Sequence, residues 1–167
     1  MIGRIIIIAS GIPPGASFLK STVSPDDFII AVDGGSLACL NAGIIPDMVI
    51  GDLDSIGLEN MEKLKSYNVT IAEYPVEKNK TDLEIAFDFA LNKNPEKIDV
   101  LGALGKRIDH LVGNIMLLHG CKKSGVPARI IDEKTEIFLA GNENFIEGKP
   151  GDIVSLIPLS EKVTGIV

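Results

Sequence analysis

Short runs of apolar, β-branched residues recur along most of the chain and alternate with segments whose apolar positions follow a helical spacing. These runs predict six strands, at residues 4–9, 28–32, 48–50, 69–72, 98–101 and 128–131. Strands that alternate with helices are typical of a parallel sheet. The pattern therefore predicts an α/β fold in which helices flank a largely parallel sheet.

Three of the intervening helices have readable ends. Residues 36–42 and 109–124 are each followed by a glycine and then, shortly afterwards, by a proline, which commonly terminates a helix. Thr81 and Glu84 form a capping box, which predicts a helix that starts there and continues to about Leu91. These ends separate the helices clearly from the strands on either side.

Beyond residue 132 the pattern changes to short alternating segments separated by glycines and by a Pro-Gly pair. They predict antiparallel strands at residues 136–139, 144–147 and 152–157. We therefore expect an α/β domain at residues 1–132 and a partial β domain at residues 133–167. So few strands leave an apolar face uncovered, so this part is expected to pack on the first domain, to pair with another subunit, or to be incomplete.

The chemically distinctive residues cluster in the loops that follow the first five strands. These loops carry the glycines, carboxylates and cations, and they are residues 11–15, 33–35, 51–55, 73–80 and 102–110. In a Rossmann-like parallel sheet flanked by helices, the carboxyl ends of the strands share one edge, where ligands bind. The sequence therefore predicts one composite site along this edge.

The loop after the third strand carries Asp52 and Asp54 directly behind an apolar run. In an extended chain, side chains two residues apart point the same way and lie roughly 7 Å apart. Two carboxylates placed in this way can hold a hard cation between them. We interpret the pair as a Mg²⁺ site, and the alternative is a solvated turn.

Composition restricts the partners and the location. The 167 residues are 46% hydrophobic, which is enough for one substantial core. The 16 Lys and Arg residues are outnumbered by 23 Asp and Glu residues, and the net charge of −7 argues against nucleic acid or an anionic membrane as a partner. No apolar run is long enough for a signal peptide or a membrane span, so we expect a cytoplasmic protein.

Four motifs in register resemble those of the thiamine pyrophosphokinase family. They are Asp-Gly-Gly at residues 33–35, Gly-Asp-Leu-Asp-Ser at 51–55, Glu-Lys-Asn-Lys-Thr-Asp-Leu-Glu at 77–84, and Gly-Ala-Leu-Gly-Lys-Arg-Ile-Asp-His at 102–110. Residues 154–160 are similar to a segment of the family's carboxyl-terminal β domain. Any one motif occurs by chance, whereas four in this order and spacing are specific.

The resemblance implies transfer of the diphosphoryl group of ATP to the hydroxyethyl oxygen of thiamine, which gives thiamine diphosphate and AMP. The attacked atom would be the β-phosphorus. The resemblance also implies Mg²⁺ as cofactor, ATP as co-substrate, thiamine as the other substrate, and a homodimer. Such catalysis depends mainly on positioning and on neutralising charge, which carboxylate-bound Mg²⁺ and a few cations provide.

The resemblance also implies roles for individual residues. The implied catalytic residues are Asp33, Asp52, Asp54, Asp82 and Arg107. The implied metal ligands are Asp52, Asp54 and Asp82. The implied contacts with the nucleotide are Gly34, Gly35, Ser55, Lys78, Lys80, Thr81, Gly105, Arg107, Asp109 and His110. We assign no catalytic role to His110.

Several of these residues have a structural alternative. Asp82 could simply be a first-turn acid favoured by the helix dipole, and Asp33 could be a turn former. Arg107 could be a surface cation or the ion-pair partner of Asp109, although a glycine-rich loop that opens a helix also binds phosphate oxygens. The lysines of residues 77–84 could be solvated loop residues.

The chain departs from the family pattern in three places. Asn79 stands where the family often has aspartate, and Lys106 stands where glycine is commonest. Family members usually continue for some tens of residues past the position of Val167, where they complete the β domain and contact thiamine across a dimer interface. The alternative functions are a pyrophosphokinase that acts on a hydroxymethylpterin and a nucleotide-binding module without turnover.

Overall fold

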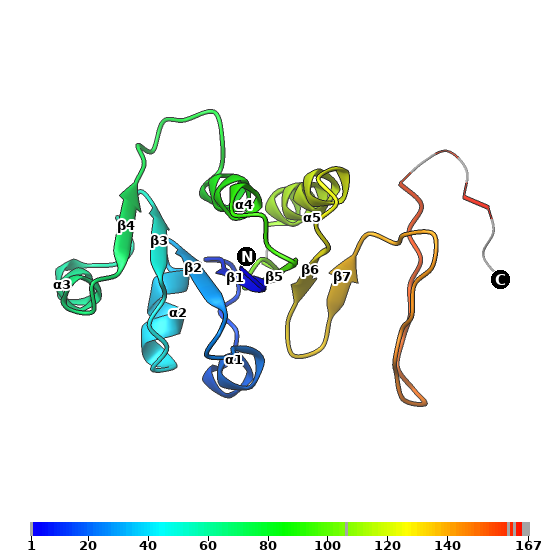
Figure 1. Cartoon of the computed structure of the whole chain (residues 1–167), viewed down its shortest axis with the longest axis horizontal. Coiled ribbons are helices and arrows are strands. Elements are labelled where there is room, and N and C mark those ends of the chain that lie inside the picture. Colours follow the sequence, from blue (N-terminus) through cyan, green and yellow to red (C-terminus); the bar gives the residue numbers. More distant parts are fainter. Residues whose placement is uncertain (1, 106, 160, 162, 165–167) are drawn as a thin grey trace.

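A computed structural model of the chain describes residues 2–105, 107–159, 161, 163 and 164 (Figure 1). The strands are β1 (Arg4–Ile8), β2 (Phe28–Val32), β3 (Met48–Gly51), β4 (Thr70–Glu73), β5 (Lys97–Leu101), β6 (Ala128–Ile131) and β7 (Glu136–Phe138). The helices are α1 (Ala16–Thr22), α2 (Gly35–Asn41), α3 (Leu58–Ser66), α4 (Asp82–Asn92) and α5 (Ile108–Lys123).

All seven strands belong to one sheet, in the order β4-β3-β2-β1-β5-β6-β7. Strands β1 to β6 are parallel, and β7 pairs antiparallel with β6. Helices α4 and α5 cover one face of the sheet, and α1, α2 and α3 cover the other (Figure 1). The predicted α/β class, with a mostly parallel sheet between helices, is therefore confirmed.

The six predicted strands and the three predicted helices are present, with ends that differ by one residue at most. The predicted capping box is also present, because the Thr81 side chain accepts a hydrogen bond from the Glu84 N–H at 3.2 Å. Helices α1 and α3 were not predicted. Each buries a single residue, Leu19 in α1 and Leu64 in α3, whereas α4 buries four, so the apolar content of α1 and α3 gives a weaker signal in the sequence.

The core has two layers, one on each face of the sheet. Strand β1 is the centre of both, because residues Ile5 and Ile7 pack beneath α4 and α5 while Ile6 and Ile8 pack against α1, α2 and α3. All four isoleucines are fully buried. A strand buried on both faces reads as a continuous apolar run, which is why the sequence identifies it so clearly.

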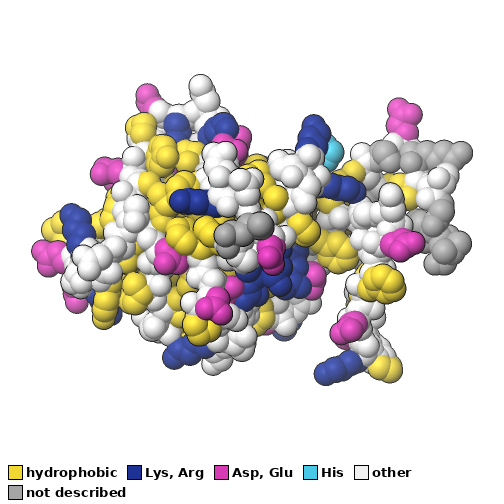
Figure 2. All heavy atoms as spheres, in the orientation of Figure 1, with side chains coloured by type: hydrophobic (Ala, Val, Ile, Leu, Met, Phe, Trp, Pro, Cys, Tyr) yellow, Lys and Arg dark blue, Asp and Glu magenta, His cyan; other side chains and the backbone are white. Residues whose placement is uncertain are grey.

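The predicted carboxyl-terminal strands are only partly present. Residues 144–147 and 152–157 form no strand, so this prediction was wrong, whereas β7 extends the sheet. Phe145 is 95% exposed and Ile153 is 90% exposed, and Figure 2 shows hydrophobic side chains on the part of the chain that projects from the body. Alternation is a local signal, but a strand also needs a neighbour for its backbone groups. The division into parts at residues 1–132 and 133–167 stays a prediction.

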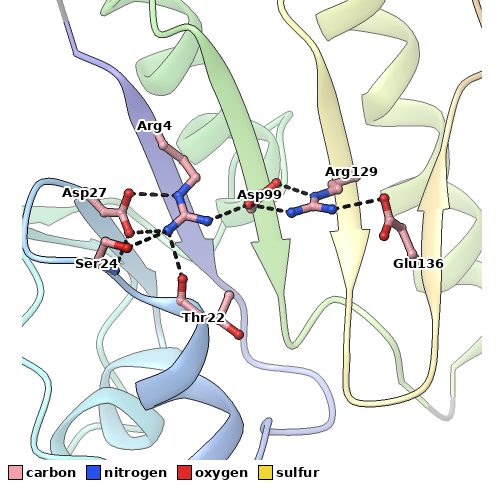
Figure 3. Close-up of polar contacts among 7 residues, drawn as sticks. All are labelled: Arg4, Thr22, Ser24, Asp27, Asp99, Arg129 and Glu136. Carbon is pink, nitrogen blue, oxygen red and sulfur yellow. Dashed lines mark hydrogen bonds and ion pairs between the residues drawn. The ribbon is translucent and has the colours of Figure 1, made fainter. Parts of the chain in front are cut away.

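A ladder of charged side chains crosses β1, β5, β6 and β7 (Figure 3). Asp99 is only 1% exposed, and its carboxylate lies between Arg4 Nη1, at 3.1 Å, and Arg129 Nε, at 2.7 Å. Arg4 also pairs with Asp27, and Arg129 pairs with Glu136. These bonds raise the pKa of both guanidinium groups, so both arginines remain charged.

No helix in the described part of the chain is both long enough and apolar enough to cross a membrane.

Candidate active site

The sheet reverses its strand order at β1, which has β2 on one side and β5 on the other. In open α/β sheets, ligands bind outside the carboxyl ends of the strands at such a switch point. Two hydrogen bonds join the loops that leave β1 and β5 there. Gly11 N–H donates to Gly102 O at 2.8 Å, and Ile12 N–H donates to Leu104 O at 2.7 Å. The two loops therefore form one wall of the candidate site.

Helix α2 begins directly against the end of β1. A Cβ at Gly35 would overlap the carbonyl oxygen of Ile8, so only glycine permits this close approach. The neighbouring Gly34 faces Ser10 Cβ at 3.5 Å and Ser55 Oγ at 3.9 Å from its ideal Cβ position. The structure therefore brings together the predicted residues Gly34, Gly35 and Ser55, and it adds Ser10, which the sequence analysis missed.

Asp33 projects from the loop after β2 toward the loop after β3. Its backbone has a φ of 44°, and its Oδ1 accepts a hydrogen bond from the Asp52 N–H at 3.1 Å. Gly51 has a φ of 151°, and a Cβ there would overlap the Asp33 carboxylate. The absence of a side chain at residue 51 therefore provides the space that Asp33 occupies.

Two other carboxylates, Asp52 and Asp82, lie near Asp33 and come from separate elements. The pKa of Asp33 is raised to about 6, mainly by burial and further by the negative charges of Asp82 and Asp52. Hydrogen bonds from the Asp52 and Leu53 N–H groups act in the opposite direction. The loops after β2 and β3 and the start of α4 thus meet, as their position at the carboxyl edge predicts.

Asp52 and Asp54 do not lie in an extended chain, so the geometry assumed for them was wrong. Leu53, between them, has a φ of 64°, and Asp54 N–H donates to Asp52 Oδ1 at 3.2 Å. An Asp side chain commonly forms such a turn with the backbone two residues later. Asp52 is partly buried and Asp54 is exposed. Both remain in the predicted loop at the carboxyl edge.

Asp82 is the first residue of α4, where a negative charge is favourable. Its Oδ1 is buried and accepts no hydrogen bond of acceptable geometry from the described residues. Lys78 Nζ lies 2.9 Å from this oxygen as an ion pair, and the same Nζ donates to Pro75 O at 2.8 Å. Asp82 therefore serves the helix start and also presents an incompletely bonded oxygen beside Asp33.

The other predicted cations are paired with nearby acids. Arg107 donates to Asp109 through Nε at 3.2 Å and through Nη2 at 2.5 Å. This is the ion pair that the sequence analysis gave as the alternative to a phosphate contact. This hydrogen bonding lowers the pKa of Asp109 to about 2. Both side chains are exposed, as is His110. Lys80 pairs with Asp88 at 2.5 Å.

The positions of the remaining predicted nucleotide contacts do not indicate a specific role in the site. Thr81 uses its hydroxyl to cap α4, and Gly105 lies in the loop after β5. Lys106, where the sequence departs from the family pattern, lies outside the described residues. Two further residues were missed: Glu133 accepts a hydrogen bond from Gly15, and Asn114 donates one to Ala103. No local pattern could have identified Glu133, because its partner is 118 residues away.

The carboxylates fit a Mg²⁺ ion that takes most of its ligands from water and phosphate. Within the described residues, no three Asp, Glu, His or Cys side chains form a group able to hold a metal by themselves. Protein-bound Mg²⁺ commonly takes only one or two carboxylates and keeps several waters. A cation here would supply a further partner for the buried Asp82 Oδ1, beside Lys78, and would offset the repulsion that adds to burial in raising the pKa of Asp33.

The fold and the site define an α/β domain with a carboxylate-rich site at the carboxyl edge of its parallel sheet. The family model for "Thiamin pyrophosphokinase, catalytic domain" matches residues 19–130, and the chain belongs to this family. The chain is 37% identical over 136 residues to the thiamine pyrophosphokinase of Bacillus subtilis, an alignment that covers 80% of this chain and 64% of that protein. It is also 33% identical over 101 residues to a rice protein, thiamine pyrophosphokinase 1, covering 56% and 37% of the two chains.

Solved structures give the same result. The crystal structure of thiamine pyrophosphokinase from Bacillus subtilis superimposes with a TM-score of 0.71 at 34% identity, covering 81% of this chain and 63% of that one. The enzyme from Geobacillus thermodenitrificans superimposes with a TM-score of 0.65 at 34% identity, covering 77% and 59%. The present chain therefore spans less than two thirds of each of these relatives.

Proposed function

We propose that the chain transfers the diphosphoryl group of ATP to thiamine with the aid of Mg²⁺ and produces thiamine diphosphate and AMP. One observation carries the proposal: Asp33, Asp52 and Asp82 converge beside the carboxyl ends of β2 and β3, in a chain that belongs to the thiamine pyrophosphokinase family. A polyphosphate bound at such an acidic site needs a divalent cation between the two sets of negative charges.

In the proposed reaction, the hydroxyl oxygen of thiamine attacks the β-phosphorus of ATP. The bond from that phosphorus to the oxygen that bridges the α- and β-phosphates breaks, and AMP leaves with this oxygen. The hydroxyl group loses its proton in the process. The protein's contribution to such a transfer is mainly to position the reactants and to neutralise charge.

Asp52, Asp54 and Asp82 are the candidate ligands of Mg²⁺, and one or two of them would bind the ion directly while water and phosphate oxygens complete its coordination. The ion would neutralise charge on the phosphate oxygens when it is bound. Asp33 would serve mainly to orient the metal-binding loop. Its Oδ1 accepts a hydrogen bond from the Asp52 N–H, and this bond positions the loop that carries Asp52 and Asp54. Burial of Asp33 near two other carboxylates also increases the site's attraction for a cation.

The nucleotide would bind between the loops after β1, β2, β3 and β5. Gly34 and Gly35 allow a close approach to the backbone there, beside Ser55 and the loop with Gly105. Arg107 would exchange Asp109 for phosphate oxygens, which its exposed position allows. Roles in nucleotide binding for Lys78, Lys80, Thr81, Asp109 and His110 stay predictions.

Two further expectations, a homodimer and a cytoplasmic location, also stay predictions. The exposed apolar side chains of residues 145–157 support the first, because apolar surface of this kind usually marks a contact with another chain. Light scattering coupled to size-exclusion chromatography would give the number of subunits.

The function is tested by incubating the protein with ATP and Mg²⁺, with and without thiamine, and separating the products by chromatography. We expect AMP and thiamine diphosphate in equal amounts, and neither when the divalent cation is chelated. ADP in place of AMP would contradict diphosphoryl transfer. Consumption of a hydroxymethylpterin in place of thiamine would favour the rival acceptor, and binding of ATP without turnover of either would favour a nucleotide-binding module.

A further inference from the structure

Three consecutive carbonyl groups in the loop after β5 each accept a hydrogen bond from another part of the site. Gly102 O and Leu104 O accept the N–H groups of Gly11 and Ile12, from the loop after β1. Ala103 O, between them, accepts Asn114 Nδ2 at 2.7 Å. Of the three donors, only Asn114 acts through its side chain, so only this bond can be removed by a substitution without altering the backbone.

Asn114 lies in α5, the helix that follows this loop, and its side chain is partly buried. The helix begins after Arg107, which occupies the N-cap position without forming a side-chain cap. The Asn114 bond therefore joins α5 back to the loop that precedes it. This bond restricts the position of the helix start that carries Arg107 relative to the switch point.

The loop after β1 is held independently at its other end. Gly15 N–H donates to Glu133 Oε1 at 2.7 Å, and Glu133 lies in the turn between β6 and β7. Loss of the Asn114 bond should therefore loosen one end of this loop, at Gly11 and Ile12, and leave the other end fixed. This loss should therefore change amide exchange at Gly11 and Ile12 but not at Gly15. A general loss of stability should change exchange at all three amides.

We propose that Asn114 is a positioning residue that holds the loops after β1 and β5 in a single arrangement. It donates a hydrogen bond to Ala103 O, while Gly102 O and Leu104 O accept hydrogen bonds from the loop after β1. Through α5 it would also fix the position of Arg107, which precedes the helix, in the proposed nucleotide site. Its effect on the loops follows from these bonds alone, whereas its effect on catalysis rests on the proposed function.

Amide hydrogen exchange in the ligand-free protein tests the effect on the loops. In Asn114→Ala we expect the Gly11 and Ile12 amides to exchange about tenfold faster or more, with Gly15 unchanged. Asn114→Asp has the same shape but presents no N–H donor, so it should behave like Asn114→Ala. The matched control is Leu117→Ala on the same helix, which removes packing against the core and keeps the hydrogen bond from Asn114 to Ala103 O. It should not accelerate Gly11 and Ile12 selectively.

Unchanged exchange at Gly11 and Ile12 in both Asn114 variants would overturn the proposal. So would faster exchange shared equally with Gly15 and with Leu117→Ala, because that pattern belongs to a general loss of stability. For catalysis, we expect the KM for ATP to rise about tenfold while the KM for thiamine stays constant. Equal changes in both would contradict a specific effect on the nucleotide. A parent protein without turnover would contradict the proposed function, and the exchange result would still decide the role of Asn114.

Discussion

The carboxylate of Asp33 lies over Gly51, in space that a side chain at residue 51 would fill. The two residues come from loops that follow neighbouring strands, β2 and β3. The arrangement is stabilised by the hydrogen bond from Asp52 N–H to Asp33 Oδ1. Residue 51 therefore controls where the partly buried carboxylate of Asp33 can lie.

We expect Gly51→Ala to lower the free energy of unfolding by about 2–4 kcal/mol, because a Cβ would overlap Asp33 and would strain a backbone with φ of 151°. Urea denaturation measures the change. Gly120→Ala, in α5, is the control, since no atom lies near its Cβ position and it should stabilise the protein by about 0.5–1 kcal/mol. If Asp33→Ala recovers none of the loss in the double variant, the overlap is not its cause.

The pKa of Asp33 predicts a pH dependence of stability. The folded pKa is about 6, above the ordinary value of 3.8, so the folded state binds the proton more tightly than the unfolded state. The contribution of Asp33 to stability therefore falls as the pH rises from the lower value to the higher. In the presence of a chelator, we expect Asp33→Asn to be more stable than the parent at pH 7, by a margin that vanishes near pH 4. A margin that does not change across this range would contradict the shifted pKa.

Asp54→Asn should abolish most turnover without affecting the fold. Asp54 is exposed in a loop, so its substitution removes no core packing and should leave the thermal midpoint within a few degrees of the parent's. Loss of a metal ligand should reduce Mg²⁺-dependent production of AMP by about 100-fold or more. Asp26→Asn replaces another exposed aspartate, before β2, and should retain parental activity. Turnover of Asp54→Asn within a few-fold of the parent would remove this residue from the metal site.

The charged ladder predicts that its buried centre, Asp99, responds more strongly to substitution than its exposed end, Glu136. Asp99→Asn should lower the free energy of unfolding by about 2–4 kcal/mol, because it removes the buried charge between Arg4 and Arg129. Glu136→Gln should cost less than about 1 kcal/mol, since that ion pair is exposed. Chemical denaturation of both variants checks the difference. Equal losses would show that burial does not determine the strength of these pairs.

The sequence predicted strands most clearly where burial is continuous, and it failed for two exposed carboxyl-terminal segments that pair with no strand among the described residues. Residues Ile5 to Ile8 are buried on both faces of the sheet, which produces an unbroken apolar run. Residues 152–157 show alternation as well, yet they form no strand among the described residues. Alternation reports only the side chains, whereas a strand also requires hydrogen bonds from a neighbour.

The candidate site shows the same limit at the level of single residues. Asp33, Asp52 and Asp82 were expected at one edge because parallel strands end together, and the structure brings them together. The path of the chain between Asp52 and Asp54 was not predicted. Leu53 adopts a positive φ that leucine does not favour, so its identity gave no indication of the turn.

The sequence by itself determined the α/β class, the boundaries of six strands and the set of loops that face the site. It could do so because burial and helix capping act over a few neighbouring residues. Only the tertiary structure decided the strand order, the switch point between β1 and β5, and the bonds that join Gly15 to Glu133 and Ala103 to Asn114. These depend on how distant segments pack together, and such contacts leave no periodic trace in the chain.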